Sequence, residues 1–411
     1  MQLLQGDIQN YAWGSVDSIP TILGTDPTGE PQAELWLGAH PLAPSALPEQ
    51  ETDLGSWLAD HPEQLGSASV GAFGERLPFL LKILAAARPL SLQAHPNRAQ
   101  AEAGFAAENE RGISLTDPTR TYRDDWPKPE MALALTPFST LSGFRDPQET
   151  SRLFAELDLG SDHNLGADLD QVIGPLTQRG GSAGLAEVFL DILSLSEERR
   201  SIVDAVVAAA LRHTDEDSEL GRFCRTAVEL DEHYPGDRGI LAGLLLNRLD
   251  LEPGQAVYLP PGNMHAHLSG TCIEILANSD NVLRGGLTPK HIDVDGLVQV
   301  VDFDGGRMPL VETQTDQPGL VHYPTPTPEF QLWRLALGRD TTGQATTLLP
   351  ATEGARILLV VDGHLACATA GETVELVKGA SAFIPAGEVV QVLGDGEAYL
   401  ASAGVSVGVP A

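Results

Sequence analysis

The chain has 411 residues, and its 25 basic and 57 acidic side chains give a net charge of −32 at pH 7. A protein this acidic, with no basic run, lacks the cationic surface that nucleic acids and anionic membranes require, so we expect neither as a partner. The length predicts two or three domains, and no apolar segment approaches the roughly 18 residues of a membrane-spanning helix.

The first part of the chain, residues 1–148, is predicted to form short strands broken by glycine and proline. We expect strands within 33–45 and 77–84, and short helices at Asp53–Ala59 and 96–109. The three cysteines are far apart, which predicts no disulfide framework and indicates a reducing, cytoplasmic location.

The pattern becomes helical after residue 148. Apolar residues from Leu185 to Leu193 recur at the i, i+3, i+4, i+7 spacing of one helix face. Further helices are expected at 199–213, 217–232 and 237–247. From residue 253 onwards, short β-branched runs alternate with glycine-rich turns, as in a sandwich or barrel.

An internal repeat relates residues 253–268 to residues 378–393 at a constant offset of 125. A glycine turn, an apolar strand, Pro-x-Gly and a second strand are typical of cupin (double-stranded β-helix, jelly-roll) barrels. We therefore predict a mainly β protein with an α-helical insertion and two such barrels. The predicted domains are 1–148 with 249–320, a helical domain 149–248, and a degenerate C-terminal barrel 321–411.

Residues that suit a divalent metal lie in several of these blocks. Gln93 and His95 are two apart and would share a strand face, and Glu130 enters a strand after a Pro-Lys-Pro turn. The first repeat adds His265 or His267, whereas the second has valine at both equivalent positions. Such a set of imidazole, carboxylate and amide groups predicts zinc or iron.

A cationic group accompanies these residues. The block 270–294 carries Glu274 and Asp280, followed by Arg284 and Lys290. Arginine offers a planar fork and lysine a point charge to phosphate, so we expect an anionic substrate. Three of the four lysines of the chain lie in the same blocks as the proposed ligands: Lys82, Lys128 and Lys290.

These blocks together resemble the type I phosphomannose isomerases of the cupin superfamily. The resemblance covers residues 10 to about 300 and is most specific in Gln-Ala-His-Pro (93–96), Lys-Pro-Glu-Met (128–131) and the stretch 279–290. It implies a zinc-dependent isomerase that interconverts mannose 6-phosphate and fructose 6-phosphate through an enediol and feeds GDP-mannose metabolism. A cytoplasmic monomer that binds a sugar phosphate is expected.

The resemblance also implies roles for individual residues. Gln93, His95, Glu130 and His265 would bind one zinc ion per chain, and Arg284 would be the catalytic arginine. Other pocket positions fall on Trp13, Lys82, Ser91, Lys128, Glu274, Asp280 and Lys290.

The sequence differs from the family pattern at His267, where the family commonly has tyrosine. It could contact substrate, support a neighbouring group or compete as a ligand. Glu274, Lys128, a zinc-bound water and His267 are all candidates for the base that moves the proton. Two other classes of protein fit the residues, an iron-dependent cupin oxygenase and a sugar-binding cupin without turnover.

Overall fold

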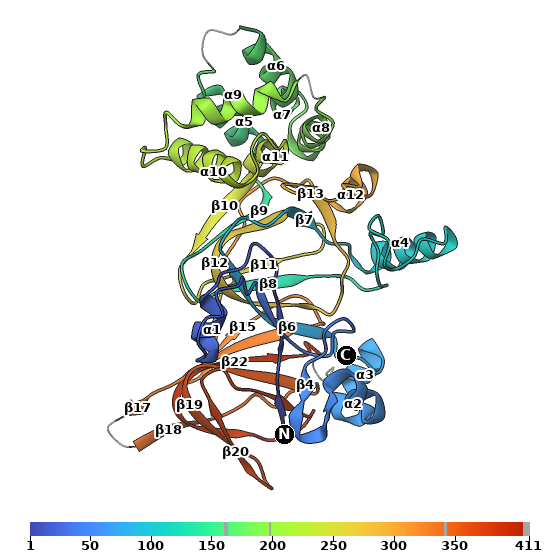
Figure 1. The fold of residues 1–411 in the computed structure, drawn as a ribbon, viewed down its shortest axis with the longest axis vertical. Coiled ribbons are helices and arrows are strands. Elements are labelled where there is room, and N and C mark those ends of the chain that lie inside the picture. Colours follow the sequence, from blue (N-terminus) through green and yellow to red (C-terminus); the bar gives the residue numbers. More distant parts are fainter. Residues whose placement is uncertain (160–162, 197–198, 341–342, 406–411) are drawn as a thin grey trace, which may run out of the picture.

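The computed structural model describes residues 1–159, 163–196, 199–340 and 343–405. A helical block lies at one end, a first β-sheet in the middle and a second β-sheet at the other end (Figure 1). All pairings between named strands are antiparallel, and each sheet is a branched ladder of ten strands rather than a closed ring within the described ranges. The predicted mainly β architecture with a helical insertion is confirmed.

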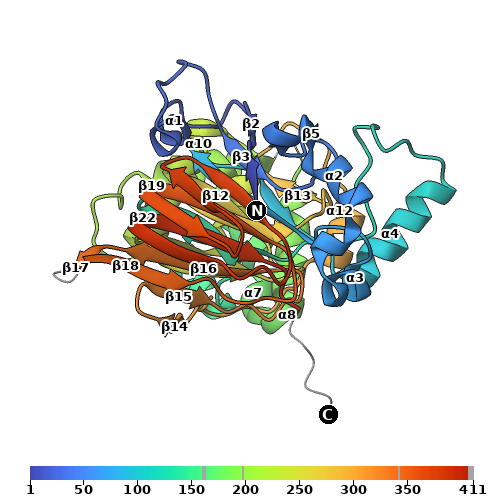
Figure 2. The same cartoon turned by 90° about the horizontal axis from the view of Figure 1, so that it is seen from below.

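The first sheet follows the order β10 (Leu246–Leu251), β9 (Phe138–Phe144), β12 (His265–Ala277), β6 (Phe79–Ala86), β3 (Glu34–Leu37) and β2 (Asp7–Gln9). Its branches are β7 (Leu92–Ala94), β8 (Glu130–Ala134), β11 (Ala256–Leu259) and β13 (Leu283–Gly286). Helices α4 (Arg98–Glu110) and α12 (Val294–Val300) lie beside the first sheet (Figure 1). Helices α2 (Leu54–Asp60) and α3 (Ser67–Phe73), with the small sheet of β4 (Ala46–Leu47) and β5 (Thr52–Asp53), lie beside the second sheet, and α1 (Ser18–Leu23) contacts strands of both sheets. Both views show α4 protruding from the side of the molecule (Figures 1 and 2).

The second sheet is formed by the C-terminal strands and the first strand of the chain. Its order is β1 (Gln2–Leu4), β21 (Ser381–Ile384), β19 (Arg356–Ala368), β22 (Gln391–Ser402), β16 (Gln331–Leu337), β15 (Leu320–Tyr323) and β14 (Gln314–Gln317). The branches are β17 (Arg339–Asp340), β18 (Gly343–Leu348) and β20 (Thr373–Val377).

The repeat predicted from the sequence appears in the backbone at the same offset. Strands β11 and β21 begin and end at residues that are 125 apart. The glycines that precede them, Gly254 and Gly379, have φ of 88° and 84°, and those that follow, Gly262 and Gly387, have φ of 86° and 73°. These left-handed turns favour glycine, which explains why the glycines recur in both copies.

Strand alternation separates an apolar face of the first sheet from a charged one. Residues such as Leu81, Ile83, Ile273 and Ile275 pack against the second sheet in a shared core. Their alternate neighbours point away from that core, into the interior between the β6–β8 and β7–β9 parts of the first sheet, which is called the first barrel below although its strands do not close into a ring. Four of these neighbours are buried and ionisable: Glu34, Lys82, Glu130 and Glu274. Buried charges are costly unless they are paired, so a cluster of them on this face indicates a functional site.

The helical block contains α5 (Pro147–Ala155), α6 (His163–Ile173), α7 (Pro175–Gln178), α8 (Gly181–Leu193), α9 (Ser201–Ala210), α10 (Glu219–His233) and α11 (Gly239–Leu244). None of the helices in the described ranges is long and apolar enough to cross a membrane. The helix predicted over 237–247 is wrong at its end, because the chain turns at Leu245 and enters β10, which pairs with β9.

The helical block is joined closely to the loop that follows β13. Gly239, the first residue of α11, leaves so little room that a Cβ would lie 2.5 Å from the backbone nitrogen of Leu287. The Asp237 carboxylate accepts hydrogen bonds from the backbone N–H groups of Gly239 and Leu287, at 2.6 and 3.4 Å.

We expect Gly239→Ala to lower the free energy of unfolding by about 2 kcal/mol, because two backbones must separate to admit a methyl group. Gly71→Ala is the matched control, since Gly71 lies in α3 with open space around it and should tolerate alanine. Urea denaturation of both variants measures the difference. Equal stability of the two would contradict the close packing.

Candidate metal centre

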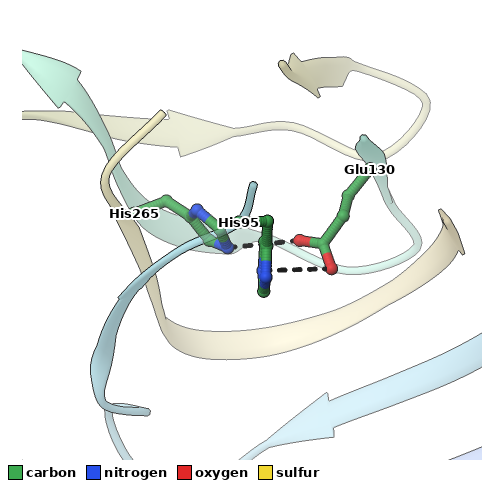
Figure 3. Close-up of side chains that lie close together, drawn as sticks. All are labelled: His95, Glu130 and His265. Carbon is green, nitrogen blue, oxygen red and sulfur yellow. Dashed lines mark ion pairs between the residues drawn. The ribbon is translucent and has the colours of Figure 1, made fainter. Parts of the chain in front are cut away.

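Three buried side chains converge inside the first barrel: His95, Glu130 and His265. Their ligand atoms all lie within 4.8 Å of one another. The Nε2 atoms of His95 and His265 are 3.4 and 3.2 Å from the two carboxylate oxygens of Glu130 (Figure 3). The side chains come from the end of β7, the start of β8 and the start of β12, which brings together residues far apart in the sequence.

Backbone carbonyls orient both imidazoles. Nδ1 of His95 lies 2.6 Å from the carbonyl oxygen of Asn281, and Nδ1 of His265 lies 3.1 Å from that of Asn263. Each Nδ1 therefore carries the proton, which leaves the Nε2 lone pair directed into the centre. Outer contacts of this kind fix metal-binding histidines in many proteins.

The inner atoms of this centre lack hydrogen-bond partners. Nε2 of His95, Nε2 of His265 and Oε2 of Glu130 are buried and have none. Burial and the nearby Lys128 lower the pKa of His95 to about 4, so this imidazole is neutral at pH 7. Burial opposes ionisation of Glu130, but His95 and Lys128 more than offset it and hold the pKa of this carboxyl well below its usual range. Two imidazoles and a carboxylate are a donor set that suits zinc.

Gln93 and Arg284 lie next to this centre in the strand register. Gln93 on β7 is directly opposite His265 of β12 and directly opposite Arg284 of β13. Opposite residues of an antiparallel pair share a face, so all three side chains project from the same side of the sheet.

Lys128 and Glu274 also face the barrel interior. Nζ of Lys128 lies 3.2 Å from Oε1 of Glu130. Nζ of Lys82 lies 3.4 Å from Oε2 of Glu274 and 3.4 Å from Oε2 of Glu34. Burial would lower the pKa of Lys82, but the carboxylates of Glu34 and Glu274 raise it above its usual value, so the lysine stays charged.

The remaining predicted pocket residues lie farther out. Trp13 stacks on Tyr11, with ring centroids 5.7 Å apart, and packs against the apolar interior of the first barrel. Asp280 is held by Nε2 of His40 at 3.3 Å. Ser91 is half-buried just before β7. None of these three side chains forms a hydrogen bond or ion pair with the metal centre within the described chain.

Arg123 is a cationic residue that sequence analysis missed. Partial burial, followed by the charges of Arg284 and Arg123, lowers the pKa of Lys290. Arg123 likewise contributes, after burial, to the lowered pKa of Arg284. No ion pair within the described ranges uses any of these three side chains, and Lys290 lines a surface hollow of about 410 Å³ with Arg238 and His291.

Asn281 is a second residue that sequence analysis missed, although it lies inside a recognised motif. Its side-chain oxygen accepts hydrogen bonds from the backbone of Arg123 and Asp124, at 2.7 and 3.2 Å, and its amide donates to the carbonyl of Trp126. Its own carbonyl orients His95. Asn281 thus links a ligand of the centre to the loop that carries Arg123.

A mainly β fold built on this repeat, with a buried centre of two histidines and one carboxylate, defines a metal-binding protein of the cupin class.

Comparison with known proteins identifies the family. The sequence model of the family described as phosphomannose isomerase type I, catalytic domain, matches residues 1–147. The mannose-6-phosphate isomerase of Escherichia coli (strain K12) is 37% identical over 394 residues, covering 94% of this chain and 95% of the relative. The mouse mannose-6-phosphate isomerase is 32% identical, with 93% of each chain covered.

Solved structures agree with these sequence matches. The apo form of mannose 6-phosphate isomerase from Salmonella typhimurium has a TM-score of 0.86 at 32% identity, covering 98% of this chain and 99% of the other. A mannose 6-phosphate isomerase bound with zinc and yttrium also has a TM-score of 0.86 at 32% identity, covering 98% and 100%. The chain belongs to the type I phosphomannose isomerase family.

Proposed function

We propose that this chain is a zinc-dependent isomerase that interconverts mannose 6-phosphate and fructose 6-phosphate. The observation that carries the proposal is the buried centre of His95, Glu130 and His265, in which both Nε2 atoms and Oε2 of Glu130 have no hydrogen-bond partner within the described chain. Gln93 completes the set of ligands, since its amide projects beside His265. The names of the full-length relatives support the reaction and the substrate.

The reaction moves a proton between adjacent sugar carbons through an enediol. Zinc bound here would polarise the sugar oxygens, which lowers the energy of the charge that develops on them. Arg284 lies on the same sheet face as Gln93, where its guanidinium can donate hydrogen bonds to those oxygens. The barrel interior around Lys82 and Glu274 is buried, so charge that develops there is poorly screened by water.

The 6-phosphate is the second feature that this site accommodates. Arg284 and Arg123 contribute, after burial, to the lowered pKa of Lys290, and Arg123 contributes to that of Arg284, so the three cations lie near one another. No ion pair in the described chain joins a carboxylate to any of them. Three cations without an ion-pair partner among the described residues, one of them directly opposite Gln93, suit a dianion such as a phosphate monoester. This arrangement accounts for the binding of an anionic substrate by a protein whose net charge is −32.

The decisive experiment is a coupled assay of fructose 6-phosphate formation from mannose 6-phosphate under nitrogen, with elemental analysis of the purified protein. We expect turnover, about one zinc ion per chain and loss of turnover with a chelator. Oxygen consumption with bound iron would instead indicate an oxygenase. Sugar-phosphate binding without turnover would indicate a non-catalytic cupin, and either result would overturn the proposal.

Zinc should also stabilise the folded chain. Binding to the native state alone contributes about 2.7 kcal/mol when free zinc is 100-fold above its Kd, because the unfolded chain has no preformed site. Thermal unfolding of chelated protein before and after addition of zinc should therefore show a rise in Tm, with magnesium as the control ion. An unchanged Tm with zinc would contradict a site formed by His95, Glu130 and His265.

The proposal extends to a monomer that acts in the cytoplasm without nucleic-acid or membrane partners. All three cysteines, Cys224, Cys272 and Cys367, are buried and unpaired, which suits a reducing compartment. The acidic net charge supports the absence of nucleic acid as a partner.

A further inference from the structure

His267 lies at the junction of two groups that face the barrel interior. It is fully buried, and its ring packs against Phe138 with centroids 5.1 Å apart. Nδ1 is 3.0 Å from the hydroxyl oxygen of Thr140, and Nε2 is 3.2 Å from Oε1 of Glu274. Both polar atoms of the imidazole therefore have a partner within the protein.

The strand that carries His267 and Glu274 is not regular, and this irregularity brings them together. The two residues are 7 apart on β12, a separation that would place them on opposite faces of a regular strand. The pairing of β12 with β9 shifts register between His267 and Ser269, and Gly270 adopts a φ of 104°. A bulge of this kind resets the alternation of faces, so both side chains point into the barrel.

The geometry also shows what His267 does not do. Its ring lies 5.9 Å from that of His265, yet its Nε2 is directed at Glu274 and not at Glu130. The group of residues that could hold a metal contains His95, Glu130 and His265, without His267. The departure from the family's tyrosine therefore leaves the ligand set intact.

Glu274 is held at both of its oxygens as a result. Oε1 accepts from His267, while Oε2 lies 3.4 Å from Nζ of Lys82. Burial would raise the pKa of Glu274, but Lys82 and the hydrogen bond from His267 lower it below its usual value. Because a carboxylate can only accept, Nε2 of His267 carries a proton. The Thr140 hydroxyl lies within hydrogen-bond distance of both Nδ1 and the Ala266 carbonyl oxygen, at 3.0 and 3.1 Å.

We propose that His267 is a positioning residue for the isomerase reaction, which fixes the orientation of the Glu274 carboxylate against Lys82 beside the metal centre. This inference rests on the proposed function. In this arrangement His267 supplies through Nε2–H the hydrogen bond that a tyrosine hydroxyl could supply, and Thr140 holds the ring in the orientation that directs Nε2 at Glu274.

The test compares His267→Phe, His267→Gln and Thr140→Val with the wild-type zinc enzyme. His267→Phe keeps a planar ring but donates no hydrogen bond, so we expect kcat to fall roughly ten- to hundredfold, as for loss of an outer-shell partner. KM and zinc content should change little, since neither the cations nor the ligands are altered. His267→Gln, whose amide can donate to Glu274, should restore most of kcat, and Thr140→Val should produce a smaller loss than His267→Phe.

A double-mutant cycle tests whether the effect passes through Glu274. Once Glu274→Gln is present, adding His267→Phe should lower kcat by less than twofold, because the orienting bond has already lost its charged acceptor. Additive losses would overturn the proposal, as would a His267→Phe enzyme within twofold of wild type or one that loses zinc. If His267→Phe does not fold, Thr140→Val decides. A kcat equal to that of wild type, or a loss of the same size with and without Glu274→Gln, would overturn the proposal.

Wild-type turnover separates this inference from the one on which it rests. A wild-type protein without isomerase activity would contradict the proposed function. If the wild type is active but His267→Phe keeps its kcat, or lowers kcat equally with and without Glu274→Gln, only the positioning role is contradicted.

Discussion

Replacing Arg284 by alanine should reduce kcat/KM for mannose 6-phosphate by roughly a hundred- to a thousandfold, the range seen when one donor to a developing oxyanion is removed. Arg284 lies on β13 directly across from Gln93. Its guanidinium has no ion-pair partner in the described chain, so its charge is available to substrate. The zinc content of the variant should remain that of the wild type, because the centre is formed by other residues.

Arg152→Ala is the matched control for this prediction. Arg152 forms an exposed ion pair with Glu156 within α5, and 54% of its side chain is accessible. Such surface pairs contribute little to stability, so this variant should retain wild-type kinetics. An Arg284→Ala enzyme with near-normal kcat/KM would show that Arg284 does not act on the reacting atoms.

Replacing His95 by alanine should remove zinc first and activity as a consequence. His95 supplies a neutral Nε2, oriented by the carbonyl of Asn281, at 3.4 Å from Glu130. Loss of a direct ligand should lower zinc affinity by more than the roughly ten- to hundredfold that loss of an outer contact costs. Competition with a metal indicator measures the affinity without reference to turnover.

His364→Ala serves as the control for the metal measurement. His364 lies on β19 in the second sheet and is 60% exposed in an ion pair with Glu375. Its loss should leave zinc binding unchanged. Full zinc occupancy in His95→Ala at micromolar protein would remove His95 from the ligand set.

The three residues that converge in the centre could be singled out from local signals in the sequence, although the choice of His265 over His267 rested on the resemblance to a known family. Glu130 follows a Pro-Lys-Pro turn into a strand, and the offset of 125 shows that the fold does not need a histidine at position 265. The apolar run at 77–84 likewise predicted the strand that carries Lys82. These residues carry their information within a few neighbours, as alternation and turn chemistry do.

The contacts that were missed depend on residues far apart. Asn281 binds the backbone of Arg123 across 158 positions of the chain, which no local pattern reveals. The end of the helix predicted over 237–247 was wrong because Leu244, Leu245 and Leu246 suit a helix and a buried strand equally well, and pairing with β9 decides between them. The role of His267 stayed open because a bulge cannot be read from alternation.

The bend of β12 has a consequence for how this family can vary. The first half of the strand pairs with β7 and β9, and the second half crosses to pair with β6 and β8. One continuous strand therefore carries His265, His267 and Glu274 on two walls of the same interior. The number of residues between them on this strand determines which way each side chain points. We therefore expect this stretch to tolerate changes of side chain but not insertion or deletion. Surface loops such as the exposed residues 24–30 are under no such restriction of length.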